Sequence, residues 1–242
     1  MTPPYTESER RLRAVVRAFL SPGVWLVVGV QFLMQLVLRQ GLPVGEAGPD
    51  PLLTLALAAF MMGFAYLQAG AYRGLAQGAE RLTLRETATA GAALFVRFLW
   101  LFLKLGLAAA LVFNLLALLL LTGADMRPEA LLRQLVPYMP PLLAALGFVF
   151  AYWLPLVFVS GDFRLFATWR RALVTAWQRL PQSGFLALIL FLPVALFALL
   201  PEATPAAVLL PLSLIASLFG WIAYIYCAEW LRDQSPRAPI SG

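Results

Sequence analysis

The chain has 242 residues, of which 62% are hydrophobic and 12% are charged, whereas soluble domains hold roughly 45–50% apolar and about 25% charged residues. A soluble protein of this length could not bury so much apolar surface, so the composition indicates an integral membrane protein. The sequence has no histidine and a single cysteine, Cys227, which excludes an intramolecular disulfide and a cysteine-based metal site.

Residues 1–21 are predicted to form a basic amphipathic helix on the cytoplasmic surface of the membrane. Thr6 and Glu9 have the spacing of a capping box, in which each side chain bonds the other residue's backbone N–H. Apolar residues recur on one face of this helix and arginines on the other: Leu12, Val15, Val16 and Phe19 against Arg10, Arg13 and Arg17. The apolar run that follows is longer than the roughly 7–15 residues of a signal-peptide core, and no small-x-small cleavage site follows it. We therefore expect an uncleaved first span.

The hydropathy pattern predicts an all-α, polytopic fold, with residues 1–242 forming a single six-span membrane domain. The six spans are expected at about 24–38, 52–72, 98–121, 141–159, 185–200 and 208–230. Thr83 and Glu86 repeat the capping-box spacing and should open a helix that runs unbroken into the third span. The longest loop, 122–140, is expected to contain a short helix ending near Val136.

Two spacings leave alternatives open. Thr6, Thr83 and Ser160 lie 77 residues apart, and each precedes a polar or amphipathic stretch and two spans. This pattern indicates either a threefold internal repeat or the periodicity of any six-span protein with short outer loops.

Gly70 and Gly74 lie four residues apart at the end of the second span, and Gly78 lies four residues further on. They form either a close helix-packing face or a chance pattern in a glycine-rich membrane helix.

The distribution of basic residues predicts the orientation, because six spans place both termini on one side of the membrane. The terminal side holds fifteen of the eighteen: Arg10, Arg11, Arg13, Arg17, Arg73, Arg81, Arg85, Arg97, Lys104, Arg164, Arg170, Arg171, Arg179, Arg232 and Arg237. The opposite side holds three: Arg39, Arg127 and Arg133. By the positive-inside rule, both termini are predicted to be cytoplasmic. The net charge of +6 is therefore a topology signal and does not indicate nucleic acid binding.

A short pattern around the fourth span suggests a family. The run Tyr152-Trp153-Leu154-Pro155-Leu156 is followed by Asp162 and by the segment from Ala172 to Leu180, which holds Ala172, Ala176 and Trp177 in an Ala-x-x-x-Ala/Ser-Trp pattern. With these residues the chain resembles a loose family of bacterial six-span inner-membrane proteins, similar to the membrane domain attached to some glycerophosphodiester phosphodiesterases. The resemblance implies a location in the bacterial inner (cytoplasmic) membrane. It implies no activity, since the sequence carries no phosphodiesterase domain.

Residues 162–180 are predicted to form a second basic amphipathic helix, with Asp162 as its N-cap. Its apolar face is expected to consist of Phe166, Trp169, Leu173, Trp177 and Leu180. Four arginines are predicted to contact anionic lipid headgroups: Arg164, Arg170, Arg171 and Arg179.

No residue pattern predicts catalysis, a metal site or a cofactor, because histidine is absent and the acidic residues lie in loops and at helix ends. Glu229, near Trp230 and Arg232, is expected in an ion pair at headgroup level. Five polar residues lie inside the spans: Gln31, Gln35, Asn114, Ser213 and Ser217. We favour interhelical hydrogen bonds for them, and the alternative is a polar groove for a lipid headgroup or a small solute.

The sequence thus favours a non-enzymatic membrane protein that acts as an interaction, assembly or scaffold component. The alternative is a lipid-handling or small-solute transport protein. The expected partners are anionic membrane lipids and either another membrane protein or further copies of this chain, and nucleic acid is not expected. A polar cavity reaching the middle of the membrane would favour transport or lipid handling, whereas a solidly packed bundle with an exposed apolar face would favour a scaffold.

Overall fold

The computed structural model describes residues 6–39, 44–45, 48–49, 51–121, 139–180, 183–200 and 204–234. The described chain forms eight helices: α1 (Glu7–Leu20), α2 (Pro22–Arg39), α3 (Pro51–Ala76), α4 (Leu84–Leu121), α6 (Met139–Ser160), α7 (Leu165–Gln178), α8 (Gly184–Leu199) and α9 (Ala206–Gln234). Two two-residue strands, β1 (Val44–Gly45) and β2 (Gly48–Pro49), pair antiparallel between α2 and α3. The predicted all-helical class is confirmed. The short helix expected near Val136 lies outside the described residues.

Each predicted span coincides with a helix, but these helices differ in length. Within the described chain, three segments are long and apolar enough to cross a membrane: Thr54–Ala76, Leu84–Val112 and Ala206–Gln234. Helices α1 and α2 make a fourth candidate if the pair, bent by 67°, is counted as one span. Two further apolar segments, Ala145–Ser160 and Gly184–Phe197, are shorter. The protein is therefore helical with three candidate membrane spans, or up to four, and the six-span arrangement and the threefold repeat are not confirmed.

Both predicted capping boxes are confirmed, whereas the predicted N-cap at Asp162 is not. Thr6 with Glu9 caps α1, and the Thr83 hydroxyl accepts from the Glu86 N–H while the Glu86 carboxylate accepts from the Thr83 N–H. The predicted Asp162 cap is wrong, because α7 begins at Leu165 and its N-cap position is occupied by Arg164. Asp162 lies too far from the first turn and instead accepts the Arg164 backbone N–H at 3.0 Å. Ser160, the third residue of the 77-residue spacing, is the last residue of α6 and precedes α7.

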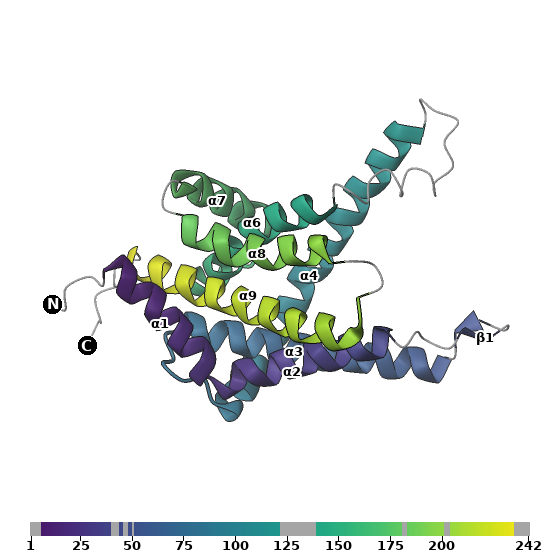
Figure 1. Ribbon diagram of the computed structural model, residues 1–242, viewed down its shortest axis with the longest axis horizontal. Coiled ribbons are helices and arrows are strands. Elements are labelled where there is room, and N and C mark those ends of the chain that lie inside the picture. The colour runs from purple at the N-terminus through teal and green to yellow at the C-terminus, as the bar shows by residue number, and fades with distance from the viewer. Residues whose placement is uncertain are drawn as a thin grey trace.

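Helix α9 occupies the middle of the bundle and contacts α1, α2, α3, α6 and α8 (Figure 1). Its last turns are almost continuously buried from Trp221 to Glu229. Arg10 of α1 bonds Asp233 of α9 at 2.9 Å, so α1 begins and α9 ends at the same end of the molecule, here called the terminal end. The most completely buried part of α9 therefore lies toward the terminal end.

The predicted cytoplasmic segments meet at the terminal end. Arg13 of α1 lies 3.6 Å from Glu80 in the turn between α3 and α4. The Arg179 guanidinium, directly after α7, stacks 4.0 Å from the centroid of the Trp230 ring on α9. These contacts bring four basic segments to one end of the molecule: α1, the turn between α3 and α4, the end of α7 and the end of α9.

Helices α3 and α4 pack closely through glycine. A Cβ atom at Gly70 would lie 1.9 Å from the Thr87 carbonyl oxygen, and one at Gly74 would lie 2.3 Å from the Leu82 side chain. The close helix-packing interpretation is thus confirmed for Gly70, whereas Gly74 packs against the side chain of Leu82 in the turn before α4. Gly78 has a different role, because its φ of +96° reverses the chain after α3 beside the Arg232 side chain.

Candidate functional site: a pocket inside the bundle

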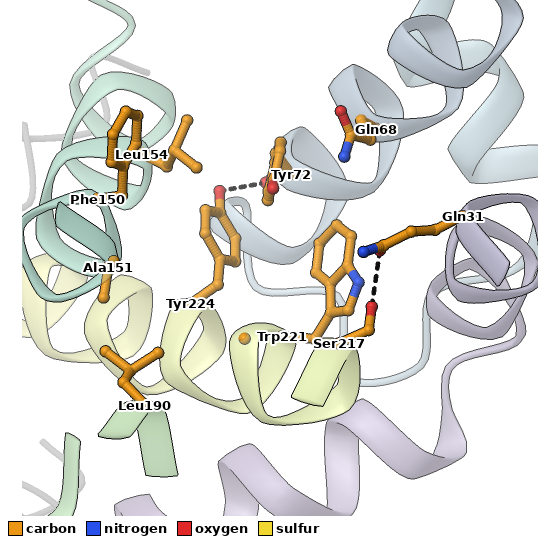
Figure 2. Close-up of a pocket in the computed structure, with 12 residues that line it drawn as sticks. Gln31, Gln68, Tyr72, Phe150, Ala151, Leu154, Leu190, Ser217, Trp221 and Tyr224 are labelled. Carbon is orange, nitrogen blue, oxygen red and sulfur yellow. Dashed lines mark hydrogen bonds between the residues drawn. The ribbon is translucent and has the colours of Figure 1, made fainter. Parts of the chain in front are cut away.

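A cavity of about 300 Å³ lies among α2, α3, α6, α8 and α9. Its polar and aromatic lining consists of Gln31, Gln68, Tyr72, Ser217, Trp221 and Tyr224. Phe150 and Leu154 of α6 and Leu190 of α8 supply apolar lining. Figure 2 shows these side chains converging from several helices, with the two glutamines on one side and the α6 side chains on another.

Two hydrogen bonds hold the polar lining in place. The Ser217 hydroxyl donates to the Gln31 amide oxygen at 2.8 Å, joining α9 to α2. The Tyr224 hydroxyl donates to the backbone carbonyl of Tyr72 at 2.6 Å, joining α9 to α3 (Figure 2). The predicted interhelical hydrogen bonding is therefore confirmed for Gln31 and Ser217, and the same two residues line the cavity.

Aromatic packing makes one wall of the pocket rigid. The Tyr72 ring centroid lies 4.7 Å from the centroids of both Trp221 and Tyr224. The centroid of the Phe158 ring, which is not part of the lining, lies 5.5 Å from that of Tyr72. Rings held on both sides in this way lose little additional freedom when a ligand enters, which favours binding.

The structure does not bring the other predicted intramembrane polar residues to the pocket. The Asn114 side chain donates to the Ala110 carbonyl on its own helix at 2.7 Å, and the Ser213 hydroxyl donates to the Leu210 carbonyl at 2.8 Å. Such bonds within one helix are common for short polar side chains. Gln35 is half-buried one turn beyond Gln31 and is not part of the lining.

Four lining residues of α3 and α9 were not predicted, although the sequence carries a signal for them: Gln68, Tyr72, Trp221 and Tyr224. Gln68 and Tyr72 lie four residues apart on one face of α3. Ser217, Trp221 and Tyr224 advance by four and three on one face of α9. A polar and aromatic stripe on a membrane helix indicates a face turned away from lipid, and two such stripes predict a shared interior surface.

A charged cluster lies at the terminal end of the bundle, away from the pocket lining. Arg17 of α1 and Glu229 of α9 form a buried ion pair, with 4% and 5% of their surfaces exposed. The Arg17 guanidinium also donates to the backbone carbonyls of Leu75, near the end of α3, and Ala79, in the turn that follows it, at 3.3 and 3.1 Å. The predicted ion pair of Glu229 exists, but its partner is Arg17 of α1 and it lies inside the protein.

Helix α1 is amphipathic as predicted, but its arginine face points into the bundle. Arg10 is buried and bonds Glu7 at 3.0 Å as well as Asp233. On the opposite face Leu12, Val16 and Phe19 are exposed, whereas Val15 is half-buried against the core. The arginines of α1 therefore hold the helix against α9 and α3, and most of its apolar face points away from the protein.

Helix α7 also turns its small residues inward. Thr168, Ala172 and Ala176 are buried, and the Thr168 hydroxyl accepts a hydrogen bond from the Trp153 indole at 2.9 Å. Of the predicted apolar face, Trp169 packs against the ring of Trp153, whereas Phe166 and Trp177 are 80% and 78% exposed.

The four arginines predicted to contact lipid headgroups lie on or beside α7. Arg170 and Arg171 are exposed, and Arg179 stacks on Trp230. The Arg164 side chain bonds Asp162 at 2.9 Å and lowers the pKa of that carboxyl group to about 2. Asp162 therefore stays ionised at any physiological pH, and its pairing partly neutralises one of the four arginines.

The described residues contain no group of three or more histidine, cysteine, aspartate or glutamate side chains placed to hold a metal ion. No family model matches the chain, and no curated protein or solved structure matches it. Three features of the described residues therefore remain as clues to function: the helical fold with its candidate membrane spans, the internal pocket and the buried charged cluster.

Proposed function

We propose that this chain is a non-enzymatic integral membrane protein that binds an uncharged amphipathic molecule in the pocket among α2, α3, α6, α8 and α9. One observation carries the proposal: the lining combines two amides and hydroxyl groups with aliphatic and aromatic side chains, and it contains no charged residue. A ligand charge buried there would lack a counterion, which is costly. The cavity volume of about 300 Å³ lies at the lower end of the range for small-molecule pockets.

The polar lining suggests which groups the ligand carries. With its oxygen accepting from Ser217, the Gln31 amide retains N–H donors, and Gln68 supplies a second amide. The Tyr224 hydroxyl donates to the Tyr72 carbonyl, so its oxygen remains able to accept. These groups match an ester, amide or hydroxyl, and the α6 side chains match an alkyl segment. The pocket therefore favours the lipid-handling or small-solute alternative.

Replacing Gln31 and Gln68 together with leucine should weaken binding of an uncharged amphiphile while the fold persists. Loss of two hydrogen bonds should cost about 1–3 kcal/mol of binding free energy. The probe is a monoacylglycerol, measured by native mass spectrometry of the purified protein. Its phosphorylated analogue, lysophosphatidic acid, should bind more weakly to the unsubstituted protein, because the lining offers no counterion.

Gln35→Leu is the matched control, since Gln35 lies on α2 outside the lining and its replacement should leave binding unchanged. If the double variant does not fold, the test is monoacylglycerol binding by the single variant Gln68→Leu. Unchanged monoacylglycerol binding in a folded variant, or preference for the phosphorylated analogue, would contradict the proposal.

We further propose six spans, with the terminal end on the cytoplasmic side of a bacterial inner membrane and α7 against anionic headgroups. The basic-residue bias and the meeting of the four basic segments at one end support this orientation. A reporter fused after Gly242 should then be active only in the cytoplasm, and one fused within 123–127 only outside.

Replacing Arg164, Arg170, Arg171 and Arg179 with glutamine should reduce the amount of anionic lipid that co-purifies with the protein. The reverse reporter pattern would refute the orientation, and unchanged lipid would leave these arginines as topology signals.

An assembly or scaffold role is the second candidate function. It is favoured by the outer half of α4, which extends beyond the other helices (Figure 1) and exposes leucine side chains such as Leu107 and Leu111. A surface of this kind suits packing against another membrane helix.

A further inference from the structure

Helix α4 carries two apolar rows on opposite faces. Leu94, Phe98 and Leu101 are buried in the bundle, and the row continues with the half-buried Leu105 and Ala108. The second row, here called the outer seam, advances by four, three, four, three and four residues: Val96, Trp100, Leu103, Leu107, Ala110 and Asn114. Every member of the outer seam is exposed.

The outer seam has the spacing of a helix–helix interface. Alternating steps of three and four residues are the pattern by which two helices pack along their length at a shallow crossing angle. Val96 and Leu107 are 74% and 63% exposed, and a Cβ atom at the neighbouring Gly106 would have nothing within 4 Å among the described residues. Small side chains such as Ala110 beside this glycine let a second backbone approach closely.

Asn114 distinguishes this face from one that only meets lipid. Its amide nitrogen donates to the Ala110 carbonyl, and no other described residue pairs with its second N–H or its oxygen on this exposed face of an apolar helix. A polar amide in hydrocarbon is costly unless it finds a partner, and Asn side chains hydrogen-bond across membrane helices for this reason. In a seam with this spacing, one Asn also fixes register and oligomeric state.

We propose that the outer seam of α4 binds the outer seam of a second copy of this chain, with the two Asn114 amides hydrogen-bonded to each other. Two copies inserted in one membrane have the same orientation, so their α4 helices run parallel. In a parallel, two-fold pair, residues at positions 100, 107 and 114 each meet the same residue of the partner. An amide is both donor and acceptor and therefore complements itself.

The outer seam itself is uncharged, and one lysine lies beside it. The nearby Lys104 ammonium lies 5.3 Å from the centroid of the Trp100 ring, and no member of the seam is charged. The pocket is lined by α2, α3, α6, α8 and α9 and by no residue of α4. The proposed dimer is thus independent of the proposed ligand, and each can fail without the other.

Cysteine cross-linking of the full-length protein in phosphatidylcholine vesicles tests the geometry. In a Cys227→Ala background, Leu107→Cys should form a disulfide-linked dimer rapidly with copper phenanthroline. Leu115→Cys is the matched control, since Leu115 is also exposed but lies about 100° around the helix from Asn114. Equal cross-linking at both positions, or none at Leu107, would overturn the proposal, and would point to lipid or a different protein on this face.

The role of Asn114 is tested by dilution of dye-labelled protein in the same vesicles, with energy transfer as the measure of dimer. Asn114→Leu should raise the dimer dissociation constant by about five- to thirtyfold, whereas Asn114→Gln should retain part of the affinity. Unchanged dimerisation of Asn114→Leu would overturn the proposed amide pair. Absence of energy transfer in the unsubstituted protein at every dilution would overturn the dimer itself.

Discussion

Replacing Glu229 with alanine is expected to lower the free energy of unfolding by about 3–5 kcal/mol, because the Arg17 guanidinium would remain buried without its counterion. Arg17 cannot easily turn outward, since it also donates to the carbonyl of Leu75 in α3 and to that of Ala79 in the following turn. The ion pair joins α1 to α9 across 212 residues of sequence, so its removal should weaken the packing of the whole terminal end. Unfolding of the purified protein in mixed micelles, followed by tryptophan fluorescence, measures the change.

Two control variants separate the buried charge from charge loss in general. Asp162→Asn removes an ion pair whose arginine, Arg164, is 76% exposed, so it should change the stability far less than Glu229→Ala. Replacing Arg17 and Glu229 together with leucine removes both buried charges and should recover much of the stability lost in Glu229→Ala. A Glu229→Ala protein as stable as the unsubstituted one would show that Arg17 is solvated or has found another anion.

The features that the sequence predicted correctly depend on residues close together in the chain. The capping boxes of Thr6 and Thr83 form over three residues, and the long run of apolar residues through α4 produces one continuous helix. The break between α1 and α2 follows from Pro22, which favours the first position of a new helix. Hydropathy and capping were sufficient for these elements because their causes are local.

The features that were missed depend on which helices become neighbours. Periodicity showed that the arginines of α1 share one face, but it could not show that Glu229 and Asp233 lie opposite that face. The same holds for the pocket, where Gln31 meets Ser217 across 186 residues. The cap of α7 was misplaced because Asp162 has the residue type of an N-cap, whereas the Gly161 turn with φ of +68° delays the helix to Leu165.

Gly70→Ala is expected to destabilise the protein by about 1–3 kcal/mol or more through overpacking at the contact of α3 with α4. The new methyl group would lie 1.9 Å from the Thr87 carbonyl oxygen and 3.0 Å from the Gly91 nitrogen. Both atoms belong to the backbone of α4, so the clash cannot be relieved by a side-chain rotation and the two helices must separate.

Gly63→Ala is the matched control, because Gly63 lies on the same helix and a Cβ atom there has nothing within 4 Å among the described residues. It should leave the unfolding midpoint unchanged or raise it slightly, since alanine favours a helix over glycine by up to about 1 kcal/mol. The difference between the two midpoints therefore isolates the contact from helix propensity. Equal midpoints would mean that α3 and α4 are held apart in the membrane, and that Gly70 does not make the close contact with α4 described above.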